Sequence, residues 1–132
     1  MSMLPEQLDL EARADINRFF NAVFGWSENS YLSAPGSALV LGWDEAEPLV
    51  FLLEHEEAML SPGHDHFALG VDGVDELERV EARALAFAAT DDRTTVLTHN
   101  IDDYGVAKLH NIFIRFLIPL LIEVQYLEIV ES

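Results

Sequence analysis

One order of predicted elements occurs twice in this chain, and this repetition limits the fold more than any other feature of the sequence. In each half, a strand is followed by a helix and then by two or three more strands. The apolar residues at three-to-four spacing indicate the first helix, and Gly25 is expected to end it in a left-handed conformation. The elements expected in the first half are a short strand at Pro5–Leu10, a helix at Ala12–Phe24, and strands at Ser37–Trp43 and Leu49–Glu54.

A charged loop at His55–Asp65, which contains Pro62 and Gly63, separates the two halves. The halves share little sequence identity, so the repetition is one of structure rather than of composition. We therefore predict an α+β domain over residues 1–132, with a first module at about 3–57 and a second at about 64–131. The elements expected in the second half are a strand at His66–Val71, a helix at Val74–Ala89, a strand at Thr94–Thr98, a turn at Asn100–Gly105, and strands at Asn111–Leu117 and Leu121–Ile129.

The charge balance excludes several kinds of partner. The chain carries 24 acidic residues against 7 lysines and arginines, which gives a formal net charge of −17. Nucleic acids and anionic membrane surfaces are therefore not expected as partners, because a protein that binds either of them needs a positively charged surface. A cationic small molecule would instead be attracted, and a salt-rich milieu would screen the self-repulsion.

The absence of cysteine removes disulfides, thiolate nucleophiles and zinc–thiolate sites from consideration. No apolar run approaches the roughly 20 residues needed to cross a bilayer. Residues 1–10 contain no basic region followed by an apolar stretch. We therefore expect a cytoplasmic protein without a membrane partner. Phosphate-binding glycine loops and serine nucleophile elbows are also missing from the sequence.

Two residues stand out as candidates for chemistry. His66 opens a short apolar strand, from which it could act as a metal ligand or as an acid–base group. Glu123 is the one acidic residue in the apolar run Leu121–Tyr126, where an unpaired carboxylate is costly to bury. A metal or another bound cation would explain Glu123, whereas the simpler interpretation of His66 is a histidine that only marks a strand end.

The segments that carry these features resemble the vicinal oxygen chelate superfamily, which includes glyoxalase I, extradiol dioxygenases and bleomycin-resistance proteins. The resemblance rests on His66–Asp72 at the start of the second half and on Phe19–Trp26 at the end of the first helix. It implies a glyoxalase-like fold, in which two βαβββ modules form a cleft.

The resemblance also implies a ligand set. His66, Glu123 and Glu54 match the family's metal-ligand positions, and Glu123 or Glu54 would be the catalytic base. The histidine that usually lies on the first strand is missing, and Gln7 is the candidate to replace it in that region. Such nitrogen and oxygen donors suit a divalent ion of Zn, Ni, Co, Fe or Mn. Glu54 also begins an acidic loop, so a solvated strand end is the alternative interpretation of that residue.

The other histidines receive simpler interpretations. His64 and His66 would point the same way on an extended strand, a spacing that can bind metal but is common by chance. His99 and His110 have no evident partner in the sequence, and we interpret both as surface or packing residues.

Three functions stay open from the sequence. The first is a metal-dependent lyase, isomerase or dioxygenase that acts on a small oxygenated molecule. The second is a non-catalytic, bleomycin-resistance-like protein that sequesters a small-molecule ligand without metal, and the third is a purely structural domain. The apolar turn Leu117–Leu121 would be unusual in water, so we expect it to be covered, and we expect a homodimer or a pseudo-dimer closed by the chain's own two halves.

Overall fold

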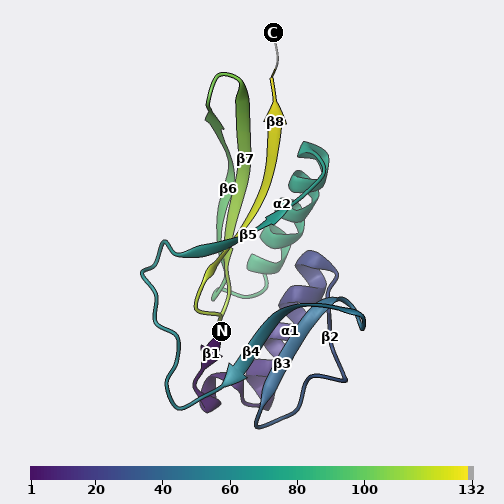
Figure 1. The fold of residues 1–132 in the computed structure, drawn as a ribbon, viewed down its shortest axis with the longest axis vertical. Coiled ribbons are helices and arrows are strands. Elements are labelled where there is room, and N and C mark those ends of the chain that lie inside the picture. The colour runs from purple at the N-terminus through teal and green to yellow at the C-terminus, as the bar shows by residue number, and fades with distance from the viewer. Residues whose placement is uncertain (131–132) are drawn as a thin grey trace. The chain divides into compact units, whose positions relative to one another are not determined.

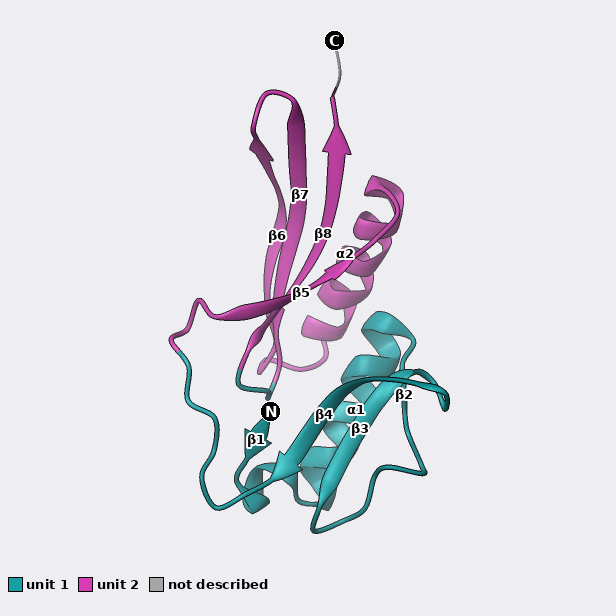
Figure 2. Cartoon of the chain, in the orientation of Figure 1, with its two compact units in different colours: residues 1–61, 117–119 teal, residues 62–116, 120–132 magenta. Residues whose placement is uncertain are grey.

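The computed structural model describes residues 1–130, which fall into two compact units (Figures 1 and 2). Unit 1 comprises residues 1–61 together with 117–119, and unit 2 begins at residue 62 and contains the rest. The expected end of the second module, at residue 131, lies outside the described residues. Each unit consists of a four-stranded sheet and one long helix.

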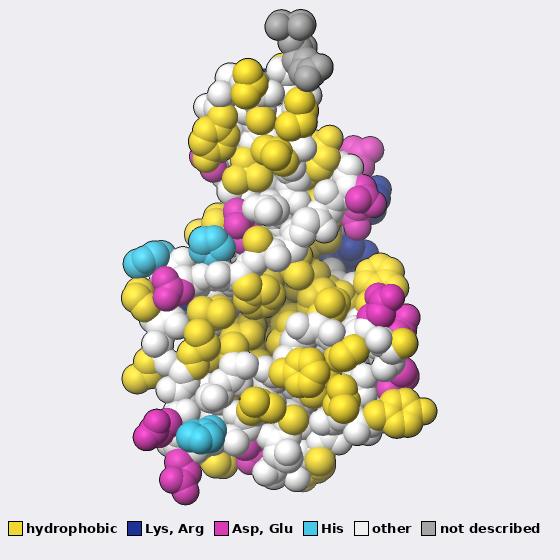
Figure 3. Space-filling model, in the orientation of Figure 1, with side chains coloured by type: hydrophobic (Ala, Val, Ile, Leu, Met, Phe, Trp, Pro, Cys, Tyr) yellow, Lys and Arg dark blue, Asp and Glu magenta, His cyan; other side chains and the backbone are white. Residues whose placement is uncertain are grey.

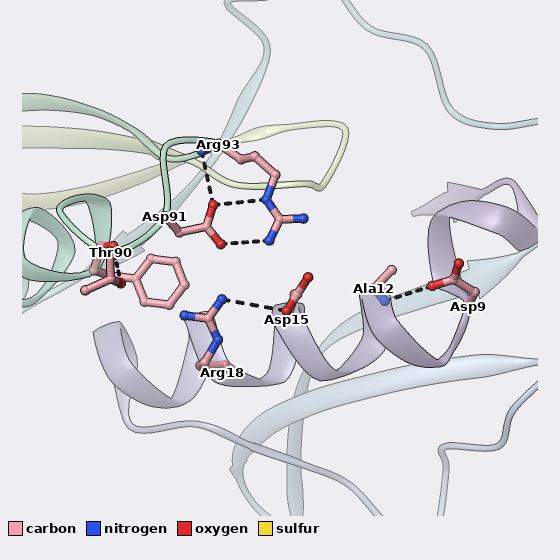
Figure 4. A network of polar contacts seen from close by, with 8 residues as sticks. Asp9, Ala12, Asp15, Arg18, Thr90, Asp91 and Arg93 are labelled. Carbon is pink, nitrogen blue, oxygen red and sulfur yellow. Dashed lines mark hydrogen bonds and ion pairs between the residues drawn. The ribbon is translucent and has the colours of Figure 1, made fainter.

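Unit 1 is a βαβββ module. Its sheet has the order β1-β4-β3-β2, in which β1 is parallel to β4 and the other pairs are antiparallel. Asp9 accepts a hydrogen bond from the Ala12 amide and so caps the helix (Figure 4), and Gly25 ends it with the expected left-handed conformation, at φ 73°. The elements are β1 (Ser2–Met3), a 3-10 helix (Pro5–Leu8), α1 (Leu10–Phe24), β2 (Ser27–Glu28), β3 (Ala38–Asp44) and β4 (Glu47–Glu54).

Unit 2 repeats this arrangement. Its sheet has the order β5-β8-β7-β6, with β5 parallel to β8 and the other pairs antiparallel. The predicted α+β class and the two βαβββ modules are therefore confirmed. The elements are β5 (His66–Gly70), α2 (Val74–Ala88), β6 (Thr95–Asp103), β7 (Ala107–Arg115) and β8 (Leu121–Ile129).

The two faces of the unit 2 sheet differ. One face packs against α2 and is buried, because apolar side chains alternate along the central strands and meet the apolar side of the helix. The other face, which we call the open face because α2 does not cover it, carries the alternate residues, including His66 and Glu123. The buried set consists of Ile112, Ile114, Ile122 and Val124 on the strands with Leu77, Val80, Ala84 and Phe87 on α2.

An ion pair between an arginine and an aspartate stabilises the loop between α2 and β6. Asp91 is buried just beyond the helix and receives two hydrogen bonds from the Arg93 guanidinium, at 3.0 and 2.7 Å (Figure 4). The same guanidinium lies 5.3 Å from the centre of the Phe116 ring. This paired charge and cation–π contact hold the start of β6 against the end of β7.

Two predictions about local structure were wrong. The expected strand at Pro5–Leu10 is a 3-10 helix, since Pro5 cannot donate to a strand ladder, and the strand of the module is Ser2–Met3 instead. The expected turn at Asn100–Gly105 is mostly strand: β6 continues to Asp103 across a bulge between Leu97 and Asn100. The bulge interrupts the alternation from which strands are recognised.

The apolar turn at Leu117–Leu121 is covered, as predicted. None of its five residues is exposed, and Ile118 is 3% exposed. Leu117 has a positive φ of 55°, and residues 117–119 pack as part of unit 1. The turn is thus buried within a single chain, so its apolar character does not require a homodimer.

Candidate functional site

The structure brings His66 and Glu123 together. β5 and β8 are parallel neighbours, and Ala68 is the direct partner of Glu123, so His66 points to the same face from two residues earlier. The Nε2 atom of His66 lies 3.4 Å from Oε1 of Glu123. The predicted proximity of the two side chains is confirmed, whereas their role as ligands stays a prediction.

The backbone fixes which nitrogen of His66 faces the carboxylate. Nδ1 of His66 lies 3.0 Å from the carbonyl oxygen of His64, which can only accept, so the hydrogen-bond pattern assigns the proton to Nδ1. A neutral His66 then presents the lone pair of Nε2 to the carboxylate of Glu123. A proton or a metal ion between these two electron-rich atoms would relieve their repulsion. The Phe113 ring lies edge-on to the imidazole, with 5.4 Å between ring centres, and limits its movement.

Glu123 is buried, with only 6% of its surface exposed. Its Oε2 atom accepts a hydrogen bond of 3.1 Å from Nδ2 of Asn111, which is also buried. Sequence reasoning missed Asn111. The available signal was weak, because Asn111 directly precedes the apolar run Ile112–Ile114 but follows His110 and so does not interrupt an apolar stretch as Glu123 does.

Glu54 is held by an arginine in unit 1. Nη2 of Arg13 lies 2.7 Å from Oε2 of Glu54, and both side chains are largely buried. Arg13 also donates to the carbonyl oxygens of Leu8 and Ala38, at 2.8 and 2.9 Å. The charge of Glu54 is therefore matched by a permanent cation, in contrast to that of Glu123.

Gln7 does not lie on a strand. It belongs to the 3-10 helix, where its Oε1 atom accepts a 2.7 Å hydrogen bond from the Leu4 amide. The first strand of unit 1 is Ser2–Met3, which offers neither imidazole nor carboxylate. Within residues 1–130, no cluster of three or more histidines and carboxylates has an arrangement that could hold a metal ion.

His99 and His110, which we interpreted as surface or packing residues without an evident partner, lie next to each other. Nε2 of His99 lies 2.9 Å from Nδ1 of His110, and Nε2 of His110 lies 3.4 Å from a carboxylate oxygen of Glu128. The β6 bulge brings His99 to the same face as His110, on the side of the sheet that packs against α2. The two histidines form a pair of their own, on the face opposite His66.

The donor atoms of the His66–Glu123 pair fit two ligands of a divalent metal. With metal–ligand bonds of about 2.0–2.1 Å at a tetrahedral angle, the two ligand atoms are separated by roughly 3.3–3.4 Å. The observed separation of 3.4 Å agrees with this value. Imidazole nitrogen with carboxylate oxygen is also a donor set that Zn, Ni, Co, Fe and Mn accept.

Comparison with known proteins identifies the fold. The sequence matches no protein-family model, and no curated protein aligns with it significantly. Among solved structures, a lactoylglutathione lyase from Agrobacterium tumefaciens aligns with a TM-score of 0.59 at 18% identity, covering 96% of this chain and 90% of that protein. The chain has the glyoxalase-like fold.

Two further structures agree with this fold. A glyoxalase/bleomycin resistance protein/dioxygenase family enzyme from Burkholderia phytofirmans aligns with a TM-score of 0.57 at 12% identity, over 96% of this chain and 94% of the other. A virulence protein from Salmonella typhimurium aligns with a TM-score of 0.53 at 17% identity, over 83% of each chain. The resemblance to the vicinal oxygen chelate superfamily is thus confirmed at the level of the fold. In the described part of the glyoxalase-like chain, no helix is both long and apolar enough to cross a membrane.

Proposed function

We propose that this chain binds a small oxygenated molecule through a divalent metal held by His66 and Glu123, as a glyoxalase-like, metal-dependent enzyme. The observation that carries the proposal is the contact of 3.4 Å between Nε2 of His66 and Oε1 of Glu123. The His64 carbonyl directs the lone pair of Nε2 towards the carboxylate, so a cation between the two atoms satisfies both.

Each residue of the site has a role in this proposal. A bound metal would supply Lewis-acid polarisation of two vicinal oxygens of the substrate. The His64 carbonyl orients the imidazole of His66, and Asn111 holds one oxygen of Glu123 by a hydrogen bond. Glu123 is the candidate base of the site. Glu54 is less suited to that role, because one of its oxygens is bound to Arg13.

The open face offers apolar surface beside these polar groups. Leu97 is the cross-strand partner of Phe113, and Leu127 is the cross-strand partner of Leu109. The side chains of Leu97 and Leu127 are each 53% exposed. Figure 3 shows further hydrophobic side chains on unit 2 around the turn between β6 and β7 and the end of β8, which is the opposite end of these strands from Glu123. A few polar groups within apolar surroundings are typical of small-molecule sites.

A second candidate is a metal-free protein that sequesters a cationic ligand, as in bleomycin-resistance proteins. Two observations favour it: the net charge of −17, and the pairing of Glu54 with Arg13, which withdraws one of the three implied ligands. In that case the buried carboxylate of Glu123 would pair with the cation of the ligand.

Calorimetric titration of metal-stripped protein with Zn²⁺, Ni²⁺ and Mn²⁺ tests the proposal. We expect one metal ion per chain and a loss of at least about tenfold in affinity for His66→Ala, because second-shell changes alone cost about 10–100-fold. The matched control is His64→Ala, which removes an exposed imidazole two residues away but keeps the backbone carbonyl that orients His66. Its affinity should stay within about twofold of the wild type, as expected for a surface change.

Equal affinities for His66→Ala and the wild type would contradict the metal proposal. The second candidate predicts a different result: metal-free protein binds the cationic dye thioflavin T, binding weakens with added salt, and Glu123→Gln abolishes it.

A further inference from the structure

Asn111 contains a buried acceptor that the proposed metal site does not use. Its Nδ2 atom donates to Glu123, but within residues 1–130 its Oδ1 atom has no hydrogen-bond partner. The residue is 4% exposed. A buried oxygen without a donor is costly and uncommon in folded proteins, so a partner outside the chain is expected.

The orientation of this amide is fixed by its neighbour. If the amide of Asn111 turned over, its oxygen would face the carboxylate oxygen of Glu123, which also accepts. The ionised form of Glu123 therefore keeps Nδ2 towards itself and leaves Oδ1 as an acceptor only. Any group that binds to Oδ1 must bring its own N–H or O–H.

Asn111 is the centre of a row of amides on the open face. Its direct partners across the neighbouring strands are Asn100 on β6 and Gln125 on β8. Gln125 is in turn paired with Gly70, where an added Cβ would meet nothing within 4 Å. The row thus ends at an exposed glycine on β5, four residues along that strand from His66.

We propose that Oδ1 of Asn111 accepts a hydrogen bond from the bound ligand, and that the ligand therefore carries an N–H or O–H donor beside its metal-binding oxygens. This inference rests on the proposed function. It narrows the ligand class to molecules such as hydroxamates, α-hydroxy amides and enediols, and it disfavours chelators that offer only acceptors. Because Oδ1 of Asn111 is buried in this structure, a neighbouring side chain must move to admit the donor.

Two matched hydroxamates test this inference. Acetohydroxamate has an N–H beside its two chelating oxygens, and N-methylacetohydroxamate has the same oxygens without the N–H. After the zinc titration, the affinity of each is measured by calorimetry on zinc-loaded wild type, Asn111→Leu and Asn100→Leu. For each protein we compare the affinity for acetohydroxamate divided by that for N-methylacetohydroxamate. This ratio should be roughly 3- to 10-fold higher for the wild type than for Asn111→Leu, as expected for one net hydrogen bond.

The controls separate the inference from the proposed function. Asn100→Leu alters the same row at an exposed residue whose amide donates to Asp102, and its ratio should equal that of the wild type. Asn111→Ala replaces Asn111→Leu if circular dichroism shows that the leucine variant does not fold. An unchanged ratio in the Asn111 variant overturns the inference while zinc binding still supports the proposed function. A wild type that binds no zinc overturns both.

Discussion

The two modules have the same strand order and each buries a carboxylate on a strand of its sheet, yet the two carboxylates have opposite surroundings. Glu54 ends β4 and is bound by Arg13, whose guanidinium also binds two backbone carbonyls. Glu123, near the start of β8, has a neutral amide and a histidine as neighbours. The first carboxylate is matched by a permanent charge and the second is not.

This difference separates a structural carboxylate from one available for binding. A fixed guanidinium lowers the cost of burying Glu54 and leaves it little reason to bind an added cation. Glu123 has a neutral hydrogen-bond donor in Asn111 but no permanent cation, so a proton, a metal or a cationic ligand would stabilise it further. Under the proposed function, Glu123 is therefore the better-suited ligand of the two, although the resemblance treats them as equivalent.

The largest effect is expected when the permanent charge is removed from unit 1. Arg13→Met leaves Glu54 buried without a cation, so the free energy of unfolding in urea should fall by about 3–5 kcal/mol. Arg79→Met, at an exposed position of α2, is the control and should change stability by less than about 0.5 kcal/mol. A similar small loss for both variants would show that the ion pair is not what holds Glu54.

Replacing each of the two carboxylates by a neutral amide should change the free energy of unfolding in opposite directions. Glu54→Gln leaves Arg13 without its counter-charge and should lower stability by about 2–3 kcal/mol, whereas Glu123→Gln keeps an acceptor for Asn111 and should leave stability equal or up to about 1 kcal/mol higher. Metal-free protein must be used for both urea titrations, because bound metal would stabilise the wild type. Losses of equal size would remove the distinction between the two residues.

The N-termini of the two helices provide a smaller comparison. Asp9 caps α1 through its side chain, and Asp9→Ala should cost about 1 kcal/mol of stability. Glu11→Ala, an acidic residue in the same first turn, is the control for the loss of charge alone. If both variants lose the same amount in thermal unfolding, the interaction with the helix dipole would account for the effect rather than the hydrogen bond.

The smallest effect is expected at the start of α2, where Gly73 provides no side-chain cap. Its φ of −173° is accessible to any residue, and an added Cβ would meet nothing within 4 Å. Gly73→Ser should therefore raise the unfolding free energy by a few tenths of a kcal/mol, roughly the difference between serine and glycine caps. Gly73→Ala, which adds the Cβ without the hydroxyl, should not reproduce the gain.

The order of elements could be predicted because it depends on local patterns. The helical spacing of apolar residues was sufficient to place α1, and the largely apolar run of residues was sufficient to place β8. The β6 bulge could not be recognised, because alternation fails where the strand has an extra residue. The first strand of unit 1 consists of only two residues and carries no periodicity.

Only part of the site could be predicted from the sequence. His66 and Glu123 were found because a resemblance named their positions and because a lone carboxylate in an apolar strand is costly to bury. The contact of Arg13 with Glu54 joins residues 41 positions apart, and no local pattern reports such a pair. The pairing of His99 with His110 depends on the same bulge that hid the length of β6.

The turn between β7 and β8 also has a consequence for synthesis of the chain. Residues 117–119 belong to unit 1, although the strands on either side of them belong to unit 2. A ribosome must therefore translate nearly the whole sequence before unit 1 has all of its parts. Until then the N-terminal module lacks residues 117–119, so its packing becomes complete only after most of unit 2 has also been synthesised.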